Sequence, residues 1–179
     1  MPPPSPTVIA WELGIRMREA REQVGISGVK AAKQLGVSQN YLSDVEHGKR
    51  KLTKETLAAA IPAYGIPEAE QEELWALREQ VDQRGWWSKY SGIFAPEVIR
   101  YFGLEHGAES IQTYENLLIP GLLQTEAYAY AVVTGDPHNV RISESNQRVK
   151  TRLFRQRRLT DDDPVRLTAV VSEAAIKQN

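Results

Sequence analysis

The chain has 179 residues, 41% of them hydrophobic and 25% charged, with a formal net charge of −1 at pH 7. This composition is ordinary for a globular protein and leaves room for one or two domains. The sequence contains no cysteine, which excludes disulfides, thiolate zinc sites and cysteine nucleophiles. It has neither an apolar run long enough to span a membrane nor a signal peptide, so we expect a cytoplasmic protein.

Charge is distributed unevenly along the chain. Between Trp11 and Lys51 there are eight basic and five acidic residues, so this stretch is basic although the whole chain is slightly acidic. Binding to phosphate depends on a local basic face and not on the overall charge. The sequence is therefore compatible with a nucleic-acid-binding segment and a second region that does not contact nucleic acid.

Two helices are predicted after a short N-terminal arm. Residues 1–10, which begin with a proline-rich stretch, are expected to be disordered. Residues 12–24 follow a helical apolar period, and Gly25 is a typical residue to end that helix. Ser27 is a typical N-cap for a second, short helix that ends at Gly36.

Three further helices are predicted in the N-terminal region. Ser38 can cap a third helix over residues 39–47. Thr53 can cap a fourth, which should end just before Pro62 because proline disfavours its continuation. A fifth is predicted over residues 68–84, where acidic residues fill the first turn as the helix dipole favours.

The composition changes at Gly85, so residues 11–84 are interpreted as one domain and residues 85–179 as a second region. Aromatic residues concentrate at the start of this region: Trp86, Trp87, Tyr90, Phe94, Tyr101 and Phe102. The periodicity then predicts a strand, two helices and a buried strand, over residues 110–114, 122–133, 144–159 and 165–171. The predicted fold class is mainly α, with five N-terminal helices followed by a small α/β region.

The most informative feature of the sequence is the spacing of residues in the second and third predicted helices. Two helices joined by a tight turn need a residue without a Cβ at the turn, here Gly36, and a small residue where they cross, here Ala31. The apolar residues of the third helix would then pack on the second. The opposite face of the third helix carries Gln39, Asn40, Ser43 and Asp44. Such side chains can hydrogen-bond base edges in a major groove, so we predict that this face contacts bases.

The stretches Ala31–Ser38 (AAKQLGVS) and Tyr41–Arg50 (YLSDVEHGKR) resemble the lambda-repressor/Cro-like helix-turn-helix regulators, often called the XRE family. The resemblance covers about residues 13–64 and implies a lambda-repressor-like DNA-binding domain. It implies base contacts for Gln39, Asn40 and Asp44, and a structural ion pair between Arg21 and Glu46. It also implies phosphate contacts for Ser27, Ser38, Tyr41, Lys49, Arg50 and Lys51.

Simpler explanations of these residues stay open. The two serines are helix caps in any case, and a phosphate contact would be an additional role. Gln39 and Asn40 could be ordinary exposed polar residues, and residues 49–51 could be a solvated basic run. The carboxylate of Asp44 can accept a hydrogen bond from cytosine, but it repels phosphate.

Residues 109–129 and 148–176 look like the companion domain that follows the helix-turn-helix in a group of actinobacterial, antitoxin-like XRE regulators. That resemblance implies an α/β unit that is often encoded beside a small acidic partner protein, and thus a partner-binding role. Members of the family continue well past the position of Glu173, so we expect the companion domain to be incomplete here.

Two features of the second region have alternative explanations. The aromatic cluster could line a ligand pocket or could form ordinary core. The basic helix could be a solvated face, or it could bind an acidic partner or the DNA backbone. Its basic residues are Arg148, Lys150, Arg152, Arg155, Arg157 and Arg158.

The sequence contains no recognisable catalytic or metal-binding motif. The histidines His47, His106 and His138 are not spaced as metal ligands. Neither a phosphate-binding loop nor a nucleophile elbow occurs. We therefore predict a binding protein and not an enzyme, without a cofactor.

Two functions from different classes are consistent with these features. The first is a sequence-specific transcriptional regulator that reads operator DNA at the nucleoid, as a homodimer because one such domain covers a single half-site. The second is an antitoxin-like protein whose main role is to bind a small partner protein, with DNA binding for autoregulation. Residues 27–51 favour the first.

Overall fold

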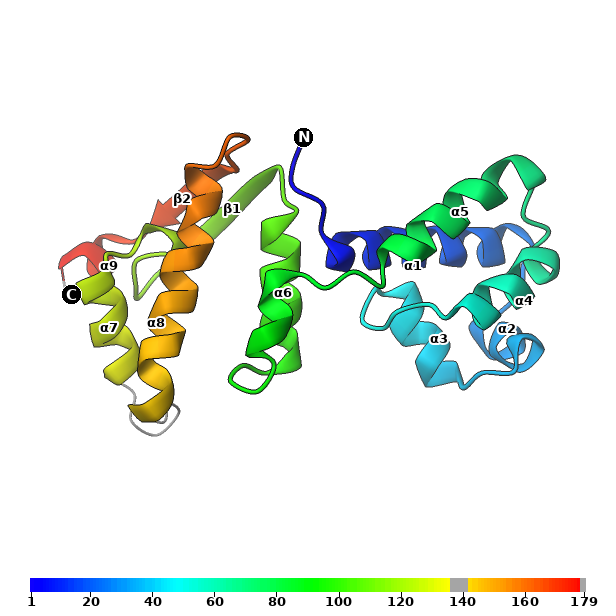
Figure 1. The fold of residues 1–179 in the computed structure, drawn as a ribbon, viewed down its shortest axis with the longest axis horizontal. Helices are drawn as coiled ribbons and strands as arrows, with labels where there is room; N and C mark the ends of the chain where they lie inside the picture. Colours follow the sequence, from blue (N-terminus) through cyan, green and yellow to red (C-terminus); the bar gives the residue numbers. More distant parts are fainter. Residues whose placement is uncertain (136–141, 178–179) are drawn as a thin grey trace. The chain divides into compact units, whose positions relative to one another are not determined.

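The computed structural model describes residues 1–135 and 142–177 (Figure 1). The chain divides into two compact units, one of residues 4–89 and one of residues 1–3 and 90–179. The elements of the N-terminal unit are α1 (Pro6–Gln23), α2 (Gly28–Leu35), α3 (Gln39–Glu46), α4 (Lys54–Tyr64) and α5 (Glu68–Gln80), and the 3-10 helix η1 (Trp86–Tyr90) spans the boundary. Those of the second unit are α6 (Pro96–His106), β1 (Ser110–Glu115), η2 (Gly121–Leu123), α7 (Glu126–Thr134), α8 (Ile142–Gln156), η3 (Arg157–Leu159), β2 (Arg166–Val171) and α9 (Glu173–Lys177).

The N-terminal unit has one apolar core. Its most deeply buried side chains are Leu13, Met17, Val45 and Leu57, which come from α1, α3 and α4. Helix α1 packs against α3, α4 and α5, and α2 packs against α3 and α4. In Figure 1, α5 crosses α1 and rises above it at one end, whereas α3 lies below α1. The prediction of five helices in this unit is confirmed.

Hydroxyl side chains cap four of these helices. The side-chain oxygens of Ser5, Ser27, Ser38 and Thr53 each accept a hydrogen bond from the backbone N–H three residues further on, at 3.1–3.5 Å. Each cap satisfies a donor that the first turn of a helix leaves without a partner, and is worth about 1 kcal/mol. The caps therefore fix where α1, α2, α3 and α4 begin.

Helix α1 begins earlier than predicted. It starts at Pro6, so the disordered arm predicted over residues 1–10 is wrong from this position onward. Ser5 is buried and caps the helix, and proline is well suited to the first helical position because its missing N–H would have no partner there.

Helix α4 continues through Pro62, where it was predicted to stop. It ends only at Gly65, which adopts a left-handed conformation with φ +63°. The extension buries Tyr64, which is 3% exposed. Burial of this large side chain offsets the hydrogen bond that Pro62 cannot make.

The second unit contains a parallel two-stranded sheet. Ser110 of β1 pairs with Arg166 of β2, and the register continues to Glu115 and Val171. Parallel strands need a long connection, and here it contains α7 and α8, which pack on each other. The predicted fold class, mainly α with a small α/β second region, is confirmed.

Local predictions in this unit were less accurate. No helix was predicted where α6 lies, and α7 begins only after Thr125, which caps it, whereas the prediction began at residue 122. Strand β2 alternates between exposed and partly buried residues, so it is not the buried strand that was predicted. The boundary between the units lies after Lys89, whereas the composition placed it at Gly85.

The basic helix is not a solvated face. Arg148, Arg152 and Arg155 are partly buried and Arg158 is buried, whereas Lys150 and Arg157 are exposed. The spacing of the first three places them on one side of α8. That side faces α6 and η2, where Arg155 contacts Glu105 and Arg152 contacts Gln124.

Candidate nucleic-acid interface

Helices α2 and α3 are joined by a tight turn. Gly36 adopts φ +68°, a left-handed conformation that glycine reaches without steric cost. The N–H of Val37 donates to the carbonyl of Ala32 at 3.0 Å, which closes the end of α2. Ala31 and Leu42 are both buried where the two helices pack. The turn and the small residue at the crossing were predicted from the sequence.

Helix α3 also approaches α1 closely, at two glycines. A Cβ on Gly14 would lie 2.2 Å from the carbonyl oxygen of Val45, and a Cβ on Gly48 would lie 2.6 Å from Cα of Trp11. Only residues without a side chain fit at these two contacts. Sequence reasoning missed Gly14, although a glycine inside a helix is destabilising and therefore indicates a packing constraint.

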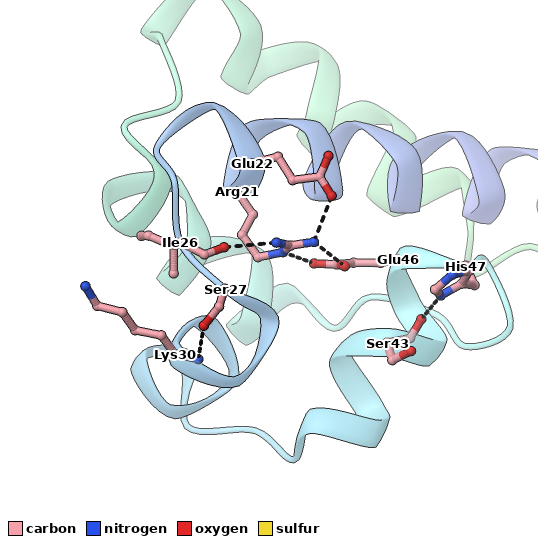
Figure 2. Close-up of polar contacts among 8 residues, drawn as sticks. All are labelled: Arg21, Glu22, Ile26, Ser27, Lys30, Ser43, Glu46 and His47. Carbon is pink, nitrogen blue, oxygen red and sulfur yellow. Dashed lines mark hydrogen bonds and ion pairs between the residues drawn. The ribbon is translucent and has the colours of Figure 1, made fainter.

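Arg21 and Glu46 connect α1 to the end of α3 (Figure 2). Nε of Arg21 donates to Oε1 of Glu46 at 2.6 Å, and Nη2 donates to Oε2 at 2.9 Å. Nη1 donates to the carbonyl of Ile26 at 2.9 Å, just before α2. The two side chains are 10% and 7% exposed, and the hydrogen bonds to Glu46 raise the pKa of Arg21. This is the arrangement that the family resemblance implied, and it ties three helices together.

The hydroxyl of Tyr64 is buried beside this ion pair. Burial, and to a lesser extent the negative charge of Glu46, raises the pKa of Tyr64 to about 12. An unfolded tyrosine ionises near pH 10, so the folded state retains this proton more tightly. The associated stability is fully present below about pH 10 and is lost as the pH rises through about 12.

We therefore expect alkaline destabilisation that depends on Tyr64. Between about pH 10 and 12 the free energy of unfolding should fall by up to about 3 kcal/mol more in the wild type than in Tyr64→Phe. At neutral pH the variant should be no less stable, because the hydroxyl hydrogen-bonds to none of the described residues. Tyrosinate absorbance during a pH titration identifies the group, and equal alkaline losses in both proteins would contradict the assignment.

The predicted base-contacting face of α3 is accessible. Gln39, Asn40 and Ser43 are exposed and Asp44 is partly exposed. On the opposite side of the helix, Leu42, Val45 and Glu46 are buried against the rest of the unit. Helix α3 therefore has one face fixed in the core, and the other carries all four residues that were predicted to contact bases.

Comparison with known protein families agrees with the arrangement of α2 and α3. Residues 12–74 match the family described as "Helix-turn-helix domain". The N-terminal unit contains a helix-turn-helix domain. Residues 98–179 match a second family, described as "Domain of unknown function (DUF5753)", so a companion domain follows. No curated protein matches the chain.

Asp44 of the helix-turn-helix domain is coupled to the basic run, which the sequence did not suggest. Its carboxylate oxygen Oδ2 lies 3.5 Å from Nε of Arg50. Its carbonyl oxygen accepts hydrogen bonds from the N–H groups of Lys49, at 2.7 Å, and Arg50, at 3.2 Å. Asp44 thus orients the basic run that follows α3, and its charge is partly balanced by Arg50.

The residues predicted to contact phosphate differ in which of their donor groups are available for a hydrogen bond to DNA. Ser27 and Ser38 cap α2 and α3 through their oxygens, so each hydroxyl hydrogen can still be donated to a phosphate. Lys49, Arg50 and Lys51 are exposed.

The hydroxyl of Tyr41 is hydrogen-bonded within the helix-turn-helix domain. Its hydroxyl donates to the carbonyl of Lys51 at 3.2 Å and accepts from the N–H of Thr53 at 3.1 Å. The hydroxyl hydrogen is already used, so Tyr41 can donate to a phosphate only by releasing Lys51. We therefore assign it to positioning the basic run.

Two other predictions concern the three histidines and membrane-spanning helices. His47 ends α3, where its Nδ1 donates to the carbonyl of Ser43 at 2.7 Å (Figure 2), while His106 lies in the second unit and His138 falls outside the described residues. Among residues 1–135 and 142–177, no helix is both long and apolar enough to cross a membrane.

Proposed function

We propose that this chain is a transcriptional regulator of the XRE type that reads operator DNA with α3 in the major groove. The observation that carries the proposal is the division of α3 into a buried face and an exposed face with amide, hydroxyl and carboxylate groups. The protein acts by binding, without a cofactor or a catalytic step, in the cytoplasm at the nucleoid.

Phosphate contacts would place α3 in the groove. The N-termini of α2 and α3 carry exposed serine caps, and helix N-termini favour anions through their free N–H groups and their dipole. The basic run that follows α3 would contact the backbone beside the groove. Such contacts fix the position of the protein on DNA, and the base contacts supply the specificity.

Gln39→Ala should relax specificity at one base position of each half-site. Gln39 is the first residue of α3, and an amide can bond adenine through two hydrogen bonds. We expect binding to the duplex with the preferred base to weaken by about 1–3 kcal/mol. Binding to the duplexes with the other three bases should change little. Equilibrium binding to four duplexes that differ at that position measures the effect. A uniform loss on all four would contradict base reading by Gln39.

Lys49→Ala and Lys51→Ala should weaken binding to every duplex by similar factors. Each replacement removes one cation that would contact a phosphate. The slope of log affinity against log salt concentration should therefore become less steep by roughly one for each lost contact. Lys150→Ala is the matched control, since Lys150 is also exposed but belongs to the second unit. If this slope were unchanged in both the Lys49 and the Lys51 variant, contact of these lysines with the DNA backbone would be contradicted.

Binding as a homodimer follows from the geometry of such a reader. One domain covers a single half-site, so two copies would bind half-sites about 34 Å apart. Sedimentation with a duplex that contains two inverted half-sites should give two chains per duplex. A monomer that binds a single half-site with full affinity would contradict the dimer.

The exposed face of the sheet favours a second candidate function, the binding of a small acidic partner protein by the second unit. Tyr114 and Val170 pair across β1 and β2 and are 68% and 58% exposed. Adjacent exposed apolar side chains often mark a protein interface. The test is purification of the tagged chain from its native cells: a stoichiometric acidic protein should be present, and should be lost from a Tyr114→Ser, Val170→Ser variant.

A further inference from the structure

Three arginines of α8 line a partly open cavity in the second unit. The cavity has a volume of about 180 Å³, which is smaller than the pockets that hold drug-sized ligands. Its polar lining consists of Arg148, Arg152, Arg155 and Thr151. Its apolar wall is formed by Phe94, Phe102 and two valines of α7. The cavity therefore combines cationic donors with an apolar surface.

The positive charge of the polar lining is only partly neutralised. Arg155 forms two hydrogen bonds of 2.7 Å with Glu105, and Arg148 lies 3.2 Å from Glu144. Arg152 donates to the neutral side chain of Gln124 at 2.6 Å and has no carboxylate partner within the described part of the chain. One guanidinium charge at the cavity is thus left without a counter-charge.

The surroundings make this uncompensated charge unfavourable. Burial and the neighbouring charge of Arg155 lower the pKa of Arg152. A charged group that is removed from water needs a counter-charge or strong hydrogen bonds. A bound anion would supply both to Arg152.

The neighbouring arginines are held in place by aromatic rings. The guanidinium of Arg148 lies 4.8 Å from the ring centroid of Phe94, and that of Arg155 lies 4.7 Å from the centroid of Phe102. Nε of Arg148 is buried and donates to none of the described residues.

We propose that this cavity binds a small organic monocarboxylate with an apolar carbon skeleton. A single negative charge balances the single unpaired guanidinium, and carboxylate oxygens match the planar donor geometry of arginine. The phenylalanine and valine side chains contact the carbon skeleton. The size of the cavity limits the ligand to a few more atoms than a benzoate ion has. The site lies wholly within the second unit and does not depend on DNA reading.

Calorimetric titration of the full chain with benzoate tests this assignment. Benzoate should bind, and benzamide, which has the same ring without the charge, should bind at least about tenfold more weakly. Inorganic phosphate, an anion without an apolar part, should also bind more weakly than benzoate. Equal binding of benzamide would overturn the role of the charge, and tighter binding of phosphate would overturn the role of the apolar wall.

Two variants and a control place the ligand in this cavity. Arg152→Gln should reduce the affinity for benzoate by at least about tenfold, whereas Lys150→Gln, which removes an exposed charge of the same helix, should leave it unchanged. Val132→Phe should abolish binding by filling the cavity while all three arginines remain. Circular dichroism establishes that the variants fold. Benzoate binding that persists in a folded Val132→Phe protein would overturn the site.

Discussion

Glu46→Ala is expected to lower the free energy of unfolding of the N-terminal unit by about 3–5 kcal/mol, because it removes the buried counter-charge of Arg21 and leaves only the exposed Glu22 beside it. Both oxygens of Glu46 accept hydrogen bonds from Arg21, and both side chains are almost completely buried. The total stability of a small domain is only about 5–15 kcal/mol, so this variant should be close to unfolding at moderate temperature.

Denaturant unfolding followed by tryptophan fluorescence measures this effect, because Trp11, Trp75, Trp86 and Trp87 are the four tryptophans of the chain and all lie in the N-terminal unit. Glu22→Ala is the matched control. Glu22 also contacts Arg21, at 3.3 Å, but it is 59% exposed, so its loss should cost less than about 1 kcal/mol. Equal effects of the two replacements would show that the buried pair does not hold the helices together.

Gly14→Ala is expected to destabilise the same unit by about 3 kcal/mol, at the upper end for an overpacked core. The new Cβ would meet the backbone carbonyl of Val45 at 2.2 Å, and a backbone atom cannot rotate away as a flexible side chain can. Helix α3 would have to move away from α1. We therefore expect DNA affinity to fall together with stability.

The matched control for this prediction is Gly28→Ala. Gly28 is also helical and has no atom within 4 Å of the added Cβ, so alanine should stabilise the protein by up to about 1 kcal/mol through a less flexible unfolded chain. Both variants are compared by denaturant unfolding at neutral pH. A Gly14→Ala protein as stable as the wild type would mean that α1 and α3 do not pack as closely as described.

Predictions from sequence succeeded where local chemistry decides the structure. Ser27, Ser38 and Thr53 cap helices whatever the rest of the chain does, and Gly36 ends α2 because of its own backbone freedom. The face of α3 beginning at Gln39 was also predictable, because helical periodicity separates apolar from polar positions. These local signals are enough to place the helix-turn-helix.

Predictions failed where tertiary packing decides the structure. Burial of Tyr64 carries α4 past Pro62, and no local signal reports that burial. The arginines of α8 have the pattern of a solvated basic face, but Glu105, fifty positions from Arg155 in sequence, draws that guanidinium inward. The contact of Asp44 with Arg50 likewise depends on the path of the chain after α3.

Selection of bound duplexes from a random pool, with the wild type and Gln39→Ala in parallel, tests most directly whether α3 reads bases. The wild type should enrich an inverted repeat with half-sites separated by about one helical turn. Gln39→Ala should enrich the same repeat with preference lost at one position in each half-site. Enrichment of no sequence by the wild type, or of an identical sequence by both proteins, would contradict the account.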